Sequence, residues 1–360
     1  MLIRYTFFIL FVGIGFQPAS LLMAETLERY HLSEDDRAHI QTAIDSAAKW
    51  LVKHQQPNGA FQSTKENGAP ALALTGMALW ALSQSEVVPQ ACDAAAAHLL
   101  SFQQEDGGIY DPTQGFVRYT AAVARQGLQT WAQHRNEPSV QEALEQLNLF
   151  VYRHQSLESL ADAEKRAAPG QITAEVEQML QRDDLSPDIR KALEFLMAAR
   201  RKATDQTPSR LSQTSATDES NPAITYDELL RYMGEISNPD NPTVWKTYYA
   251  LRAYYRLDGN PDLTKRYGPD GFQDKSAGLY HYYLTAARTL GTVSRPELKM
   301  LDGTRHDWAK ELSQKLISLQ NDEGFWVNEN PRWLEGDPLL VTCYVMISLS
   351  ICRDVKVAKP

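Results

Sequence analysis

Cysteine is scarce in this sequence. The 360 residues include three, Cys92, Cys343 and Cys352. Three widely spaced cysteines provide neither a disulfide framework nor the paired CxxC spacing of a zinc site. We therefore expect each of them to be a small, buried, apolar side chain. A chain of this length buries enough surface to fold without disulfides.

Clustered positive charge is also lacking. The chain has 36 Lys and Arg against 45 Asp and Glu, which gives a net charge of -9. Surfaces that bind nucleic acid need dense groups of Lys and Arg, so nucleic acid is not an expected partner. A moderately acidic balance is typical of a soluble protein.

One apolar run near the N-terminus, at 6–16, follows Arg4 and precedes Pro18. It is short for a bilayer span and fits the apolar part of a secretory signal. We expect 1–24 to be a cleaved signal peptide and the protein to be exported, to the periplasm or beyond; an uncleaved membrane anchor is the alternative. Cleavage leaves no integral membrane span, a single domain at 25–352 and a tail at 353–360.

Three segments repeat one pattern. A helical stretch ends at a glutamine, a glycine follows four residues later, and an aromatic residue follows two or three residues after the glycine. The three copies are Gln55 with Gly59 and Phe61, Gln103 with Gly107 and Tyr110, and Gln320 with Gly324 and Trp326. A weaker fourth copy ends at Gln155 and lacks the glycine and the aromatic. The spacing of about 50 residues predicts about six units.

Each unit pairs two kinds of helix. The helix before the glutamine is amphipathic, with Ile40, Ile44 and Leu51 on one face of the first copy. The helix after the turn is apolar, rich in small residues and suited to burial on most sides. An all-α fold follows, and alternation around a circle predicts an α/α toroid with inner and outer rings. Degenerate pairs should lie near 186–202 and 241–259. A polar insert at about 156–222 is expected to be partly disordered.

The glutamine turns are interpreted as structural fasteners. A glutamine amide at a helix end can join the unsatisfied carbonyl groups there to the N–H groups that begin a neighbouring helix. The glycine allows a left-handed turn, and the aromatic residue should cover the amide and strengthen its hydrogen bonds.

These repeats resemble the glutamine–tryptophan repeats of squalene–hopene and oxidosqualene cyclases, whose toroid is shared with the β-subunits of protein prenyltransferases. Near the C-terminus, GLYHYY at 278–283, RHDW at 305–308 and the turn at 326–338 resemble exported bacterial prenyltransferase/squalene-oxidase-repeat proteins. The resemblance implies a toroid whose centre receives an isoprenoid or another apolar molecule.

The sequence departs from the chemistry of these families. The DxDD acid of the cyclases is absent, and so is the Asp-x-Cys pair of the prenyltransferase zinc site. We therefore expect no metal and no cofactor. The pair Asp35 and Asp36 is interpreted as a helix cap.

Candidate site residues lie in the C-terminal half. Tyr280, Tyr282, Tyr283 and, one unit earlier, Tyr249 would line a substrate cavity, where aromatic rings stabilise a carbocation; ordinary packing is the alternative. The candidate catalytic residues are His281, Glu335 and Asp337. His281 could instead be a structural histidine, and Asp337 before Pro338 could instead cap a helix.

Two functions remain open on this evidence. The first is a terpenoid cyclase or prenyltransferase-like enzyme acting on an isoprenoid or other apolar substrate. The alternative is a non-catalytic binding or scaffold toroid in the exported compartment, whose centre is filled by its own side chains. A carbohydrate-active barrel is disfavoured because the glutamine fasteners are not expected there. The partner implied is an apolar small molecule or a lipid, and the sequence carries no signal of oligomeric state.

Overall fold

The protein is mostly helical, which confirms the all-α prediction. The structure is a computed structural model that describes residues 32–65, 68–114, 116–133, 137–166, 181, 242–261, 274–295 and 297–355. The elements along the chain are α2 (Glu34–Val52), α3 (Ala71–Leu82), α4 (Pro89–Leu100), α5 (Val117–Ala132), α6 (Pro138–Arg166), α10 (Pro242–Tyr254), α11 (Leu279–Val293), β1 (Leu298–Lys299), β2 (Arg305–His306), α12 (Trp308–Ser318), the 3₁₀ turn η2 (Arg332–Leu334) and α13 (Pro338–Asp354).

Parts of the sequence prediction lie outside the described residues: the signal peptide at 1–24, the helix near 186–202, and nearly all of the polar insert beyond 166. None of the helices that the structure does describe combines the length and the apolar character needed to cross a bilayer.

Helix α6 corrects one expectation. The fourth repeat was expected to end its helix at Gln155, but α6 continues without a break to Arg166 and includes the first part of the predicted insert. The other three glutamines have a glycine four residues later, whereas Ser159 occupies that position here. Without a residue that readily adopts a left-handed turn, the helix has no local signal to stop.

The predicted inner helices are buried on nearly all sides. In α3 every residue from Leu72 to Leu82 is buried, and in α13 the same holds from Leu339 to Ser350. Their small residues allow close approach: a Cβ atom added to Gly127 of α5 would lie 2.4 Å from the carbonyl oxygen of Gly76 in α3. The apolar composition therefore did identify the core helices.

The predicted outer helices keep one solvent face. Helix α2 buries Ile40, Ile44 and Leu51, as its periodicity predicts. Its N-terminus is a capping box in which the Ser33 hydroxyl accepts from the Asp36 amide and the Asp36 carboxylate accepts from the Ser33 amide. The acidic pair at its start thus belongs to a helix cap, with Asp36 as the residue that makes the bonds.

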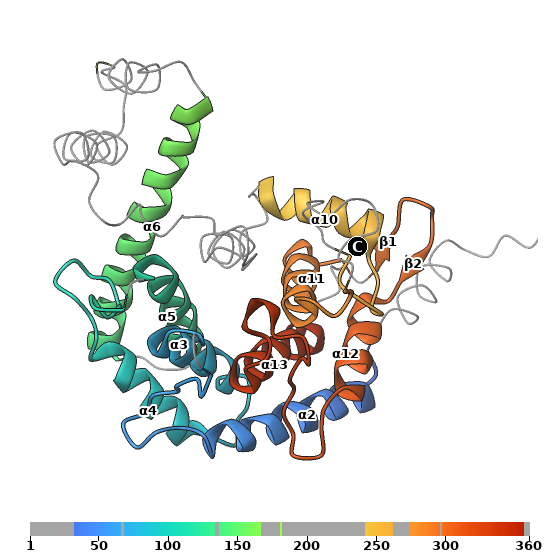
Figure 1. Ribbon diagram of the computed structural model, residues 1–360, viewed down its shortest axis with the longest axis horizontal. Helices are drawn as coiled ribbons and strands as arrows, with labels where there is room; N and C mark the ends of the chain where they lie inside the picture. Colours follow the sequence, from blue (N-terminus) through green and yellow to red (C-terminus); the bar gives the residue numbers. More distant parts are fainter. Residues whose placement is uncertain are drawn as a thin grey trace, which may run out of the picture.

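Figure 1 shows how the helices are arranged. Helices α3, α5, α11 and α13 lie centrally, and α2, α4, α6, α10 and α12 lie around them. Helix α3 packs against both α5 and α13, and α13 packs against α11. The first described helix, α2, contacts both α12 and α13, and Lys310 of α12 forms an ion pair with Asp36 of α2 at 3.5 Å. The two ends of the described chain are therefore neighbours.

A short hairpin precedes α12. Strands β1 and β2 pair antiparallel, with Leu298 opposite His306. The Arg252 side chain of α10 donates to the carbonyl of Lys299 at 2.7 Å, and the Leu301 amide donates to the carbonyl of Arg252 at 2.9 Å. The hairpin, which the sequence pattern did not predict, connects α10 to the start of α12.

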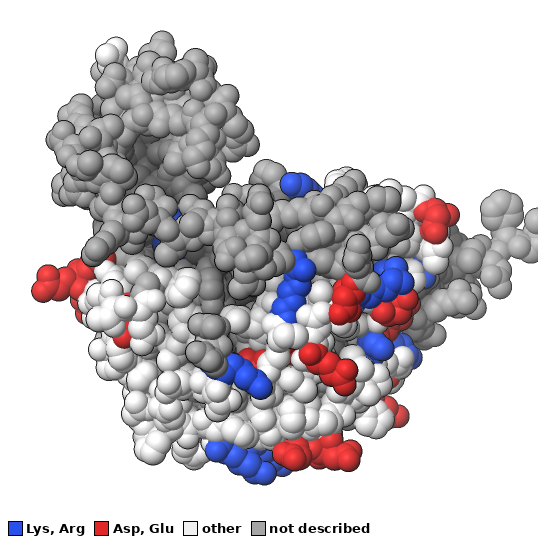
Figure 2. Space-filling view, in the orientation of Figure 1, with Lys and Arg blue, Asp and Glu red and all other residues white. Residues whose placement is uncertain are grey.

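Charge is dispersed over the visible surface. Figure 2 shows acidic and basic side chains interspersed with uncharged surface on the face that it presents. This face therefore offers no large area of one sign for electrostatic steering of a charged macromolecule.

Candidate functional site

In each of the three complete repeats the glutamine side chain donates a hydrogen bond to a carbonyl of another helix. The side-chain amide of Gln55 donates to the carbonyl of Ala91 in α4 at 2.9 Å. Gln103 donates to Ala143 in α6 at 3.1 Å, and Gln320 donates to Ala43 in α2 at 3.0 Å. Each glutamine therefore joins its turn to another of the predicted outer helices, so the predicted fastening between units is present, although through other groups than expected; we call this contact a glutamine clamp.

The groups that bond to each glutamine side chain differ from those predicted. The glutamine nitrogen donates to carbonyl oxygens, and we had expected N–H groups at a helix start. Gln55 and Gln320 also donate to the carbonyls of Gly59 and Gly324 in their own turns, at 3.0 and 2.8 Å. The accepting alanines lie inside helices, so these carbonyls serve both a helical amide and the clamp.

The glycine completes each clamp by close approach. Gly59, Gly107 and Gly324 have φ values of +86°, +86° and +97°, which confirms the predicted left-handed turn. A Cβ atom on Gly59 would lie 2.1 Å from the carbonyl oxygen of Ala94, and one on Gly107 or Gly324 would lie 2.8 or 3.0 Å from the carbonyl oxygen of Gln146 or Ser46. In every case this second carbonyl lies three residues after the one that accepts the glutamine.

The residue two positions after the glycine is the buried one. Phe61 and Trp326 occupy it and are almost fully buried, and their backbone amides donate to the hydroxyls of Thr75 and Thr342 on the next inner helices. In the second copy Ile109 takes this position. Tyr110, the aromatic residue assigned to this copy, lies one position later; it is partly buried and its hydroxyl donates to Asp106. Stacking of an aromatic ring on the amide stays a prediction.

The aromatic segment at the start of α11 points in several directions. Tyr282 and Tyr283 donate their hydroxyls to the carbonyls of Arg256 and Leu257, at 2.9 and 2.7 Å. Tyr280 is 5% exposed, whereas Tyr249 on α10 is 55% exposed and lies beside the Arg252 guanidinium. Tyr280 and Tyr283 therefore line one pocket, between α11 and α12, whereas Tyr282 and Tyr249 lie outside its lining.

Gly278 explains why α11 begins where it does. Its φ is +66°, and a Cβ atom there would overlap the Trp333 ring at 1.9 Å. Trp333 and Leu334 themselves have positive φ values of 62° and 63°, a costly conformation for residues with side chains. The strained turn brings the Trp333 ring over the start of α11, where it meets His281 edge-to-face at 5.5 Å.

The Glu335 side chain accepts hydrogen bonds at the start of α11. Its side chain is fully buried; one carboxylate oxygen accepts from the His281 amide at 2.6 Å and the other from the Asn328 side chain at 2.6 Å. Burial raises the pKa of Glu335 to about 7, although the hydrogen bonds from Asn328 and from the backbone of the first turn lower it. The carboxyl group therefore occupies the positive end of the helix.

Asp337 is the N-cap residue of α13. Its carboxylate accepts from the Leu339 amide at 2.9 Å, and Pro338 takes the first helical position. This confirms the helix-cap reading of Asp337. Asp307 caps α12 in the same manner, accepting from the Lys310 amide at 3.3 Å.

His281 is enclosed by aromatic rings and one cation. Its ring lies edge-to-face with Tyr344 at 6.1 Å as well as with Trp333. Burial, and then the charge of Arg288, lower the pKa of His281 to about 4. The imidazole is therefore neutral at physiological pH.

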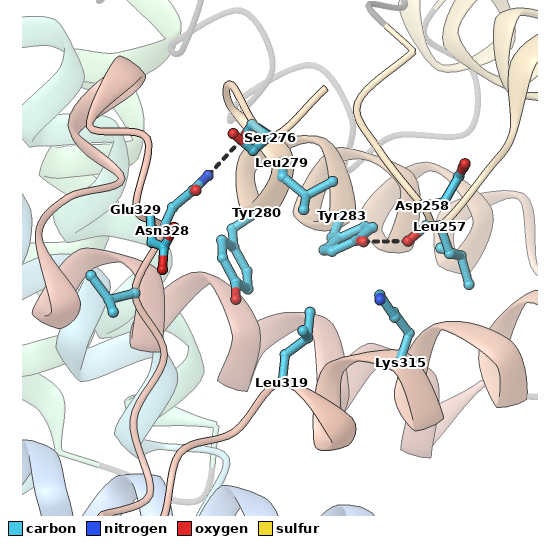
Figure 3. Close-up of a pocket in the computed structure, with 11 residues that line it drawn as sticks. Leu257, Asp258, Ser276, Leu279, Tyr280, Tyr283, Lys315, Leu319, Asn328 and Glu329 are labelled. Carbon is cyan, nitrogen blue, oxygen red and sulfur yellow. Dashed lines mark hydrogen bonds between the residues drawn. The ribbon is translucent and has the colours of Figure 1, made fainter. Parts of the chain in front are cut away.

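A pocket opens between α11 and α12. Its volume is about 260 Å³. Figure 3 shows Tyr280 and Tyr283 of α11 facing Lys315 of α12 and Leu319, the residue that follows α12. The lining residues come from four segments of the chain: Leu257, Asp258, Ser276, Leu279, Tyr280, Tyr283, Lys315, Leu319, Val327, Asn328 and Glu329.

The pocket has an apolar body with few polar groups. Asp258 is paired with Arg256 at 2.5 Å, and burial raises the pKa of Tyr280 to about 12, with a smaller contribution from Glu335. His281, Glu335 and Asp337 are not among its lining residues. Within the described part of the chain, no group of three or more His, Cys, Asp or Glu side chains is placed to hold a metal ion.

Sequence reasoning missed most of this pocket. Lys315 and Leu319 lie one helical turn apart, which could have marked a common face, and Asn328 lies in the turn on which the resemblance rests. That they would meet Tyr280 depends on how α12 packs against α11.

No family model matches this sequence, and no curated protein matches it.

Proposed function

We propose that this chain is a non-catalytic binding toroid whose ligand is a small molecule held between α11 and α12. The observation that carries the proposal is the placement of the three candidate catalytic groups. Glu335 and Asp337 cap helices, His281 is enclosed by rings, and none of the three lines the pocket. Acid–base catalysis needs a group within hydrogen-bond reach of the substrate.

The toroid is part of this proposal, and the clamps support it. They run in one direction, from α12 to α2, from α2 to α4 and from α4 to α6. Tyr255 takes the place of the glutamine after α10, with Gly259 four residues later, and its ring meets His306 at 5.2 Å just before α12. A one-way series of contacts between outer helices, around buried inner helices, is the arrangement that a closed ring requires.

The pocket supports a compact ligand. Sites for drug-sized molecules range over roughly 300–1,000 Å³, and this one has about 260 Å³. Its apolar side chains suit a molecule with one aromatic or branched aliphatic group. The N-terminal sequence supports an exported location, which fractionation of cells expressing the full chain would test.

Ligand-observed NMR with 3-phenylpropanol tests the binding function. We expect saturation transfer to the probe from the purified protein and its loss in Leu319→Trp, which fills the pocket. Leu301→Trp is the matched control because Leu301 is 65% exposed and lies outside the pocket. Equal transfer in all three proteins would contradict binding at this site.

The enzyme alternative has one observation in its favour. Tyr280 and Tyr283 stand edge-to-face at 6.0 Å, a wall that would stabilise a carbocation. Incubation with farnesyl diphosphate and with squalene, analysed by mass spectrometry, separates the two functions. We expect no product; a product that Glu335→Gln abolishes, while Gln56→Ala does not, would replace the binding proposal with catalysis.

A further inference from the structure

Two partly buried polar groups in the pocket have no partner among the described residues. Lys315 is half-buried, and among the described residues none forms an ion pair or hydrogen bond with its ammonium group. The Tyr280 hydroxyl faces the same space (Figure 3) and likewise receives no bond from the part of the chain that the structure describes. Partly desolvated donors of this kind are satisfied by water or by a ligand.

Most of the remaining polar side chains of the lining are already bound within the protein, and Glu329 is exposed to solvent. Tyr283 donates to the carbonyl of Leu257 at 2.7 Å. The Asn328 amide donates to the carbonyl of Ser276 and to Glu335, each at 2.6 Å. Asp258 pairs with Arg256. A ligand therefore meets Lys315 at one side of the pocket and the Tyr280 hydroxyl at the other, with apolar side chains between them.

The start of α11 is closed to a ligand. A free helix N-terminus near the pocket would favour a phosphate, which commonly binds there. In this protein the Glu335 carboxylate already accepts from the first turn of α11. One lysine remains as the cation, which suits a singly charged anion better than a phosphate or a diphosphate, whose sites gather several charged donors.

We propose that the pocket binds a compact monocarboxylate with one aromatic or branched aliphatic group. The carboxylate pairs with the Lys315 ammonium, and the apolar group lies between Tyr280 and Leu319. The Tyr280 hydroxyl, at the far end, donates to a second acceptor of the ligand or to water. This inference rests on the proposed binding function, and it adds the charge and the orientation of the ligand.

A variant of Glu329 tests the proposed orientation of the ligand. It lines the pocket, and its side chain is exposed. A carboxylate seated at Lys315 would be repelled weakly by Glu329, since exposed charges interact by small amounts. Glu329→Gln should therefore leave affinity for a carboxylate unchanged or raise it about two-fold. A loss of affinity would mean that the acid attracts a cationic ligand.

The decisive experiment compares three probes of one shape: 3-phenylpropionate, its neutral amide and 3-phenylpropylamine, each titrated by calorimetry at constant pH. We expect the carboxylate to bind at least about ten-fold more tightly than the amide, because a hydrogen bond between charged groups is strong in a partly dry site. Lys315→Met, which keeps the apolar stem of the side chain, should remove that preference, and Lys315→Arg should retain it. Lys49→Met is the matched control, since Lys49 is exposed on α2.

Each result decides a different question. Equal binding of carboxylate and amide overturns the charge inference but leaves the pocket as a binding site. A preference for the amine, or a preference for carboxylate that persists in Lys315→Met, also overturns it. Binding of inorganic phosphate in place of the carboxylate overturns the monocarboxylate assignment. Failure of all three probes to bind contradicts the binding function together with the inference. Thermal unfolding of each variant shows whether a lost affinity reflects a lost fold.

Discussion

Glu335 is an ionisable group placed where its charge is costly. Its carboxyl group is fully buried, and its two oxygens hold the start of α11 and the side chain of Asn328. The same residue therefore stabilises the turn through hydrogen bonds and penalises it through desolvation. The balance between these effects depends on pH, and this can be measured.

Replacing Glu335 with glutamine should change how stability depends on pH. The pKa of Glu335 is raised from 4.5 to about 7 in the folded protein. Between these values the folded chain holds a proton that the unfolded chain has lost, so this group's contribution is present at low pH and is lost as pH rises through 7. Relative to Glu335→Gln, the wild type should lose about 3 kcal/mol of unfolding free energy between pH 4.5 and 8.

Urea denaturation of both proteins across this range checks the sign. His281 acts in the opposite sense: its pKa is lowered to about 4, so its contribution is lost as pH falls from 6.5 towards 4. The difference between wild type and Glu335→Gln removes this second effect, because both proteins retain His281. Parallel pH profiles for the two proteins would show that Glu335 has an ordinary pKa.

The clamp glycines should not tolerate a side chain. In Gly59→Ala the new Cβ atom would lie 2.1 Å from a backbone oxygen of α4, so the two helices must separate. Gly303 also has a positive φ, +91°, but nothing lies within 4 Å of its added Cβ atom. Gly303→Ala therefore measures backbone strain alone, about 1–2 kcal/mol. Gly59→Ala should cost at least about 2 kcal/mol more, and equal losses in chemical denaturation would refute the close contact.

At the scale of the element, the glutamines act through the number of bonds each makes. The side chains of Gln55 and Gln320 each donate to two carbonyls. Among the described residues, the Gln103 side chain donates to one, the carbonyl of Ala143. Replacement by alanine should cost about 1–3 kcal/mol for Gln55 and Gln320 and about half as much for Gln103. Gln56→Ala is the control because, within the described ranges, its exposed side-chain amide donates only to the Gln62 side chain. A loss at Gln56 equal to that at Gln320 would argue against the clamp as the source of stability.

Much of each element could be predicted because its signal is local. The left-handed glycines, the buried faces of α2 and the buried lengths of α3 and α13 follow from spacing and composition within a few turns. The N-caps at Asp307 and Asp337 follow from the residue type and the proline after Asp337.

The remainder depended on partners far away in the chain. The carbonyl that receives Gln320 is 277 residues distant, so no periodicity could identify it. In hindsight a local signal exists: the accepting alanines Ala43, Ala91 and Ala143 each stand twelve residues before the glutamine of their own repeat, Gln55, Gln103 and Gln155. The pocket had no such signal, because Lys315 meets Tyr280 only through the packing of α12 on α11.

At the scale of the whole molecule, the Gln320 clamp is one of the contacts that join the two ends of the described chain. Gln320 follows α12, and its side-chain amide donates a hydrogen bond to the carbonyl of Ala43 in α2, the first described helix. The Lys310–Asp36 ion pair lies at the same junction, but half-exposed pairs of this kind contribute little. The buried glycine turn and its clamp therefore contribute more to the junction of α12 with α2 than the ion pair does, and the packing of α13 on α2 adds to it.

Loss of the Gln320 clamp should loosen two helices that are distant in sequence. If the outer helices form a closed ring, Gln320→Ala removes one link, and both α2 and α12 gain freedom to open. In native-state hydrogen exchange followed by mass spectrometry, amides of both helices should exchange about ten-fold faster, which corresponds to about 1.4 kcal/mol of local opening.

Gln103→Ala is the matched variant and should act on α4 and α6 instead. Helices α3 and α13 should remain the slowest to exchange in all three proteins because they are buried along nearly their whole length. Faster exchange in α12 alone would mean that the junction with α2 is not a structural link, and the closed ring would have to be abandoned.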